Sequence, residues 1–176
     1  ASPRYVFVAL EQPLVQDGPT ADAERGADLR LLRYGRDLSL LATHHYRTDP
    51  TPEHEDASIG VTEVVAIDDE HLLVLERATY REGDDYANRI RIYAIDVGVA
   101  DDMTDVARHA PIPKRLVLDL DTIAPTLQPT PALDNFEGMA LITTRGRPTH
   151  LLLVSDDNFS PRQRTSFILL AIEGAP

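Results

Sequence analysis

The sequence predicts an all-β protein, and three observations lead to that prediction. Short apolar runs recur along the whole chain of 176 residues, and turn-forming residues separate them. The chain contains 13 Pro and 9 Gly, a composition typical of many turns. Helical periodicity is weak, and only residues 101–109 indicate even a short helix.

The first predicted strands come from apolar runs with a turn signal beside them. Residues 5–10 read YVFVAL, a strong β run, and the segments 29–34 and 38–46 flank Gly35-Arg36-Asp37, a hairpin signal. Farther on, residues 59–67 lead through the acidic turn 68–70 into the apolar run HLLVLER at 71–77.

The remaining predicted strands show alternation or continuous apolar character. The segments NRIRIYAID (88–96) and RLVLDLD (115–121) alternate apolar with polar residues, a pattern typical of a half-buried strand. Three apolar runs, at 136–143, 150–154 and 166–172, complete the set.

The spacing of these strands predicts β-propeller blades. They fall into groups at about 5–46, 59–121 and 136–172, and the middle group has four strands with short links, which is the unit of a propeller blade. We therefore expect a single all-β region over residues 1–176 that consists of about three four-stranded meanders. The first group would lack its innermost strand and the last group its outermost strand.

Three blades are too few to close a ring, because propellers have about four to eight. We therefore expect this region to be part of a larger propeller of the six-bladed type. The missing N-terminal half, in the same polypeptide or in a separate chain, would then be its partner. A complete β-sandwich of ten strands is the alternative that the strand pattern leaves open.

Charge and composition narrow the classes of partner. A net charge of −12 disfavours nucleic acid, because phosphate backbones are bound by clustered Lys and Arg. No apolar run approaches the roughly 20 residues of a membrane span. Cysteine is absent, which removes thiolate ligands and thiol nucleophiles.

Acidic residues lie where strands of different groups would meet. Two candidate innermost strands each carry a Glu and a Gly near their start, Glu63 with Gly60 and Glu137 with Gly138, and glycine permits close backbone approach there. The apolar run before residue 155 ends in Asp156, Asp157 and Asn158. Carboxylate and amide oxygens crowded around one channel would suit Ca²⁺ or Mg²⁺. The alternative is that these Asp and Asn residues only form a turn.

Three ordered motifs, NFEGMA (135–140), LLLVSDDNF (151–159) and QRT (163–165), resemble the phytase-like family known as "esterase-like activity of phytase". Residues 59–63 and 73–77 are similar to that family's preceding blade, so the resemblance covers about residues 58–172. It implies a bacterial β-propeller that is often periplasmic or secreted, although a cytoplasmic location stays open. It also implies phosphoester or ester hydrolysis, with N-terminal blades that this sequence does not contain.

Two functional hypotheses follow from the residues and the resemblance together. In the first, Ca²⁺ held by Glu137, Asp156, Asp157 and Asn158, with Glu63 and Glu11, activates water against a small phosphorylated or ester substrate. Glu137 and Asp156 are then the candidate catalytic residues. In the second, the protein is a non-catalytic binding or scaffold propeller with a structural calcium ion.

Overall fold

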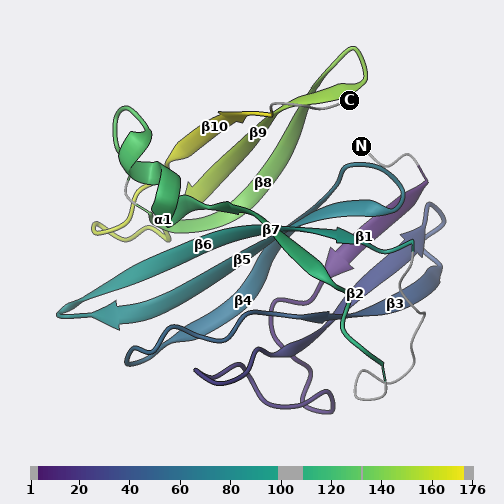
Figure 1. Ribbon diagram of the computed structural model, residues 1–176, viewed down its shortest axis with the longest axis horizontal. Coiled ribbons are helices and arrows are strands. Elements are labelled where there is room, and N and C mark those ends of the chain that lie inside the picture. The colour runs from purple at the N-terminus through teal and green to yellow at the C-terminus, as the bar shows by residue number, and fades with distance from the viewer. Residues whose placement is uncertain (1–3, 99–108, 132, 173–176) are drawn as a thin grey trace.

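The computed structural model describes residues 4–98, 109–131 and 133–172, which form three antiparallel β-sheets (Figure 1). The helix expected over residues 101–109 lies outside the described residues except for its last residue. No helix among the described residues is long and apolar enough to cross a membrane.

The sheets follow the chain from one end to the other. The first sheet contains β1 (Tyr5–Ala9), β2 (Asp28–Gly35) and β3 (Leu40–Arg47). The middle sheet contains β4 (Ser58–Ala66), β5 (His71–Glu82), β6 (Asp85–Asp96) and β7 (Lys114–Asp119). A short helix α1 (Leu120–Ile123) and a 3-10 turn (Ala124–Thr126) lead to the last sheet, which contains β8 (Asn135–Thr144), β9 (Arg147–Asp156) and β10 (Phe167–Ala171).

This architecture confirms the all-β prediction, and each predicted strand group forms one sheet. The middle sheet has the four strands of a complete meander, and among the described residues the first and last sheets have three strands each, the numbers that their groups in the sequence predicted. The alternative of a ten-strand sandwich is wrong, because a sandwich has two sheets and the described residues form three. The closed ring of blades stays a prediction.

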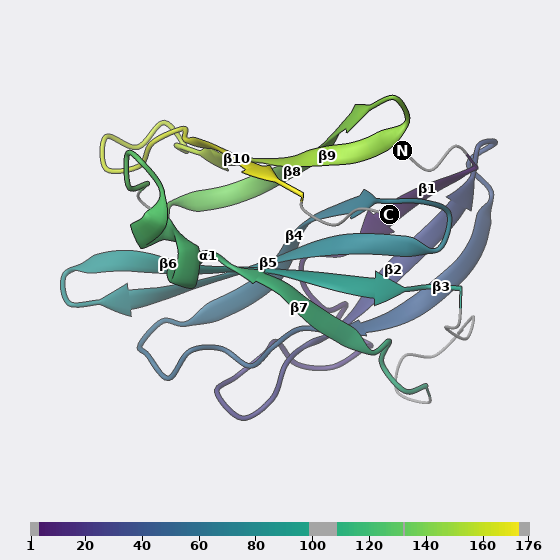
Figure 2. The ribbon, with the colours of Figure 1, turned by 45° about the horizontal axis from the view of Figure 1, so that its top comes forward.

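The first strands of the three sheets lie next to one another. Both β1 and β8 contact β4, so these three strands form the common inner edge from which the sheets extend (Figure 2). The expectation that the first group lacks its innermost strand is therefore wrong. The first sheet begins with its inner strand, β1, and then adds β2 and β3 outward.

Two apolar layers hold the sheets together, and the middle sheet lies between them. Leu29, Leu72 and Val74 belong to the layer between the first and middle sheets. On the other face, Leu75 and Phe136 belong to the layer between the middle and last sheets. The continuous apolar run of β5 has its explanation here, because a strand covered on both faces is apolar at successive positions.

Close approach at the inner edge explains two glycines. A Cβ atom on Gly60 would lie 2.7 Å from the carbonyl oxygen of Glu11, and one on Gly138 would lie 2.5 Å from Cγ1 of Val154. Both distances are too short for a real side chain. The prediction that these glycines permit close packing is thus confirmed.

The hairpin formed by β5 and β6 is longer than the sequence indicated. We expected these strands at 71–77 and 88–96, but pairing continues from His71↔Asp96 to Glu82↔Asp85. Pairing of β4 with β5 ends at Thr79, and pairing of β7 with β6 ends at Arg91. The end of the hairpin therefore projects beyond both neighbouring strands, as Figure 2 shows.

Candidate ligand cleft

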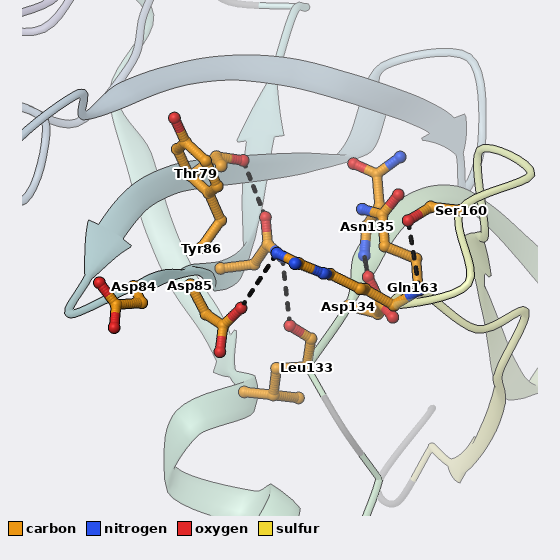
Figure 3. A pocket seen from close by; sticks show the side chains of 11 residues that line it. Thr79, Asp84, Asp85, Tyr86, Leu133, Asp134, Asn135, Ser160 and Gln163 are labelled. Atoms are coloured by element: carbon orange, nitrogen blue, oxygen red, sulfur yellow. Dashed lines mark hydrogen bonds and ion pairs between the residues drawn. The ribbon is translucent and has the colours of Figure 1, made fainter.

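A cleft of about 1010 Å³ lies between the projecting β5–β6 hairpin and the last sheet. Its lining residues come from three parts of the chain that are distant in sequence: Thr79, Asp84, Asp85, Tyr86, Asn88, Leu133, Asp134, Asn135, Ser160, Arg162 and Gln163. Figure 3 shows these side chains around the opening. This volume is typical of sites for small molecules.

Hydrogen bonds tie the hairpin wall to the segment before β8. The Thr79 hydroxyl donates to Oδ1 of Asn88 at 2.8 Å, and Nδ2 of Asn88 donates to the carbonyl oxygen of Leu133 at 3.3 Å. Asn88 therefore fixes the distance between the two walls. Its remaining amide hydrogen and lone pair can still meet a ligand.

The opposite wall is ordered by a buried carboxylate. Asp134 is only 9% exposed, and its two oxygens accept from the backbone N–H of Asn135 at 2.9 Å and from that of Arg164 at 2.8 Å. These bonds connect the start of β8 with the loop between β9 and β10. Asn135 follows Asp134 in the chain and is only 6% exposed. Both polar groups of this wall are therefore held in place by the packing around them.

The mouth of the cleft carries its most accessible charges. Nη1 of Arg162 lies 3.6 Å from Oδ1 of Asp85, and both side chains are about 80% exposed. An ion pair this exposed adds little stability, so its partners can rearrange around a ligand. Tyr86 lies beside them on the hairpin with 62% of its surface exposed.

The predicted residue Glu137 lies at the inner edge, where Arg77 neutralises it. Oε1 of Glu137 is 2.6 Å from Nη1 of Arg77, and Oε1 of Glu11 is 3.6 Å from Nη2 of the same guanidinium. Arg77 lies on β5, so it connects the middle sheet to the other two. The positive charge that lies beside Glu137 and Glu11 is therefore the guanidinium of Arg77.

The other predicted ligands serve local structure. Oε1 of Glu63 accepts from the backbone N–H of Val64 at 2.8 Å. Oδ1 of Asp156 accepts from the N–H of Asn158 at 3.0 Å, and Oδ1 of Asp157 accepts from that of Phe159 at 2.9 Å. These bonds are the ones that Asp forms in turns, which supports the turn interpretation of this segment.

The oxygen donors predicted to bind calcium do not gather as that ion requires. Among the described residues, no group of three or more His, Asp or Glu side chains is close enough to hold a metal ion. Calcium needs six to eight oxygen ligands at about 2.3–2.6 Å. The five predicted ligands Glu63, Glu137, Asp156, Asp157 and Asn158 are therefore not gathered in one such group among the described residues, and the calcium site stays a prediction.

Sequence reasoning found some cleft residues only through the family motifs. Asn135 and Gln163 belong to those motifs and line the cleft. Asp84, Asp85, Tyr86 and Asp134 gave no signal of their own, because the fold brings them together from separate segments. The acidic turn at Gly83-Asp84-Asp85, in a stretch with few apolar residues, is the one local feature that could have indicated a projecting hairpin.

A second polar group lies deep between the first and middle sheets. Glu76 is 1% exposed; its Oε1 accepts from the Tyr46 hydroxyl at 2.6 Å and from Nζ of Lys114 at 2.5 Å, and its Oε2 accepts from the Asp49 N–H at 2.9 Å. Lys114 also lies 2.8 Å from Oδ1 of Asp49. We call Tyr46, Asp49, Glu76, Tyr93 and Lys114 the buried polar network.

Burial and pairing act in opposite directions on the acids of this network. Burial raises the pKa of Glu76, and the charge of Lys114 offsets that effect only in part. For Asp49, burial also acts to raise the pKa, but hydrogen bonds from Lys114 and Tyr93 outweigh it and the pKa is lowered. Every oxygen of the two carboxylates has a partner, since Oδ2 of Asp49 accepts from the Tyr93 hydroxyl and from Nη1 of Arg91, so the network is structural.

Taken together, the fold and the cleft define an all-β protein of several packed sheets with an open polar cleft at one end. The family model "esterase-like activity of phytase" matches residues 1–159, and the chain therefore belongs to this phytase-like family. No curated protein and no solved structure matches the chain.

Proposed function

We propose that this phytase-like domain hydrolyses a carboxylic or phosphoric ester that binds in the cleft. The observation that supports this proposal is the cleft itself, in which the motif residues Asn135 and Gln163 lie beside an exposed carboxylate and an exposed guanidinium. Membership of a family described by its esterase-like activity adds further support.

The charged pair at the mouth of the cleft supplies the two groups that ester hydrolysis needs. The Asp85 carboxylate would accept a proton from a water molecule as that water attacks the carbonyl carbon or phosphorus of the ester. The Arg162 guanidinium would neutralise the negative charge that develops on the ester oxygens. Asp85 would then return the proton to the departing alcohol oxygen as the ester bond breaks.

The amide side chains would position the substrate. Asn88 is held by Thr79 and Leu133, and Gln163 accepts from Nδ2 of Asn158 at 3.2 Å. Groups with one hydrogen bond already fixed lose little freedom when they bind a ligand, which favours correct orientation.

Turnover of p-nitrophenyl acetate and p-nitrophenyl phosphate by the full chain tests this proposal. We expect Asp85→Asn to lower kcat by about 10²–10⁴ through loss of the base. We expect Arg162→Ala to lower it by about 10²–10³ through loss of transition-state stabilisation. Glu24→Gln, at an exposed position outside the cleft, is the matched control and should keep the parent rate.

Two results would reject the proposal. One is the absence of turnover with either ester under every condition, including added calcium. The other is full turnover in both cleft variants, which would move the chemistry elsewhere. If Glu137→Gln lost turnover and Asp85→Asn kept it, the catalytic site would lie at the inner edge, as the sequence predicted, and not in the cleft.

A second candidate function is non-catalytic binding, as a scaffold or binding domain. The specific observation in its favour is that Asp134 and Glu137 already have partners, and that Ser160 accepts from the Arg162 N–H at 3.3 Å, so these groups serve local structure. Saturable ligand binding without turnover would select this function.

Three expectations from the sequence stay proposals. We propose that the protein binds calcium; the effect of a chelator on turnover and on thermal unfolding tests this. We also propose that a partner supplies further sheets of a ring, and that the protein is periplasmic or secreted. Native mass and cell fractionation test these two expectations.

A further inference from the structure

The cleft is acidic, which bears on the ligand it can accept. Its lining contains three carboxylates, Asp84, Asp85 and Asp134, and one guanidinium, Arg162. The formal charge of the lining is therefore −2, within a chain whose net charge is −12. A phosphate group carries about −1.5 to −2 near neutral pH, so each phosphate of a ligand meets repulsion here.

The neutral polar groups of the cleft match hydroxyl groups. Asn88, Asn135 and Gln163 present carboxamides, each of which both donates and accepts hydrogen bonds. The exposed carboxylates of Asp84 and Asp85 accept hydrogen bonds from hydroxyl groups. Adjacent hydroxyls of a sugar or polyol offer the same mixture of donors and acceptors, without a charge.

Tyr86 adds an aromatic surface at the same site. Tyr86 is 62% exposed on the projecting hairpin, beside Asp85 and opposite the loop that carries Arg162. Tyrosine combines a flat apolar face with a hydroxyl group, so it suits ligands that are apolar on one side and wet on the other. A sugar ring has this character.

From these observations we infer that the cleft binds a neutral, hydroxyl-rich molecule, such as a sugar or polyol carrying an ester, in preference to a polyphosphate. The inference rests on the proposed function in two respects only, that the ligand carries an ester and that it binds in this cleft. Asp84 and Asp85 reject anions, Tyr86 covers one face of the sugar ring, and the amides bind its hydroxyls. Arg162 is left to meet the ester oxygens.

Calorimetric binding to the full chain tests this, and the two glucose probes carry no carboxylic or phosphoric ester that the proposed hydrolysis would consume. The neutral probe is 6-O-methylglucose, the anionic probe of similar size is glucose 6-sulfate, and inositol hexakisphosphate is the polyanion. We expect saturable binding of 6-O-methylglucose and at least about ten-fold weaker binding of glucose 6-sulfate at low salt. Added salt should narrow that difference, because it screens the exposed carboxylates.

Matched variants locate the effect. Tyr86→Ala should weaken binding of the neutral probe several-fold. The double variant Asp84→Asn with Asp85→Asn should strengthen binding of glucose 6-sulfate relative to that of 6-O-methylglucose, so that the ratio of the two affinities falls toward one. The double variant Glu24→Gln with Glu53→Gln removes the same charge from exposed positions outside the cleft, and it should change neither affinity.

The outcomes separate this inference from the proposed function. Binding of inositol hexakisphosphate or glucose 6-sulfate as tight as that of 6-O-methylglucose would overturn the inference, even if esters are hydrolysed. Absence of binding of the neutral probe would overturn it too. Selective binding of the neutral probe without ester turnover would support the inference and reject hydrolysis.

Discussion

The two junctions between sheets are built from different chemistry. Between the first and middle sheets, the buried polar network lies beside the apolar layer, and Glu76 is 1% exposed. Between the middle and last sheets, Phe136, Leu75 and Leu153 pack as a purely apolar layer. The second junction then opens into the cleft at one end.

This difference indicates how the chain separates stability from binding. In the buried polar network, the carboxylates of Glu76 and Asp49 meet partners within the protein, so no group is left for a ligand. At the second junction the apolar layer holds the sheets together, and Asp85 and Arg162 at the mouth of the cleft make a weak, exposed contact. These two groups can thus vary with little loss of stability.

The largest expected effect comes from the apolar layer of the second junction. Phe136 is fully buried, so Phe136→Ala should lower the free energy of unfolding by about 3–5 kcal/mol. Phe159 is fully exposed, and Phe159→Ala should change it by less than about 0.5 kcal/mol. Denaturant unfolding measures both, and equal effects would contradict the placement of this layer.

The buried polar network should show the next largest effect. Glu76→Gln removes the negative charge that Lys114 and the Tyr46 hydroxyl contact. Lys114 still has its ion pair with Asp49. We expect a loss of about 2–3 kcal/mol in the free energy of unfolding. Glu24→Gln is the exposed control. Unchanged stability in Glu76→Gln would mean that the attraction between Glu76 and Lys114 does no more than offset the cost of removing their charges from water.

Acid should weaken the first junction through Asp49. The pKa of Asp49 is lowered in the folded protein, so its contribution is present above the ordinary value of 3.8 and is lost as the pH falls through the folded pKa. Water reaches part of the carboxylate and screens its charge, so we expect this contribution to be smaller than the effect of Glu76→Gln. Unfolding of the parent and of Asp49→Asn between neutral and acidic pH should show a difference that shrinks on acidification.

Glu76 changes stability with pH in the opposite direction. Its pKa is raised in the folded protein, so stability falls as the pH rises through the window that begins at the ordinary value of 4.5. The comparison with Asp49→Asn is therefore best repeated in the Glu76→Gln background, where that contribution is absent.

The smallest expected effect belongs to the ion pair at the inner edge. Glu137 is 40% exposed, so Glu137→Gln should cost no more than about 1 kcal/mol. Thermal unfolding at low and high salt measures this, and salt should remove most of the difference. If Glu137→Gln lowered the free energy of unfolding as much as Phe136→Ala does, the ion pair with Arg77 would stabilise the contact between the sheets as strongly as the apolar layer does.

The sequence predicted those parts of the fold that local patterns encode. The apolar run at residues 71–77 indicated the strand β5, and Gly60 and Gly138 indicated close approach. The outer half of the β5–β6 hairpin was missed because residues 80–87 meet no apolar layer and so carry no core pattern. Its pairing comes from backbone hydrogen bonds, which leave little trace in sequence.

The site was harder to predict than the fold, for a physical reason. The acidic run at Asp156 and Asp157 looks like a ligand set in sequence, yet its oxygens bind the backbone of their own turn. Arg77 follows Glu76 directly, but the two side chains of a strand point to opposite faces and find different partners. Distances between sheets decide such pairings, and one sequence does not contain them.

The projecting hairpin also suggests how members of this family could diversify. At the turn, a Cβ atom added to Gly83 would meet no heavy atom within 4 Å, so residues can be inserted there without disturbing any packed layer. A longer or shorter hairpin would reshape one wall of the cleft and leave the sheets beneath it unchanged. New ligand preferences could therefore arise by changes in loop length alone, and the same turn is a practical site for grafting recognition loops.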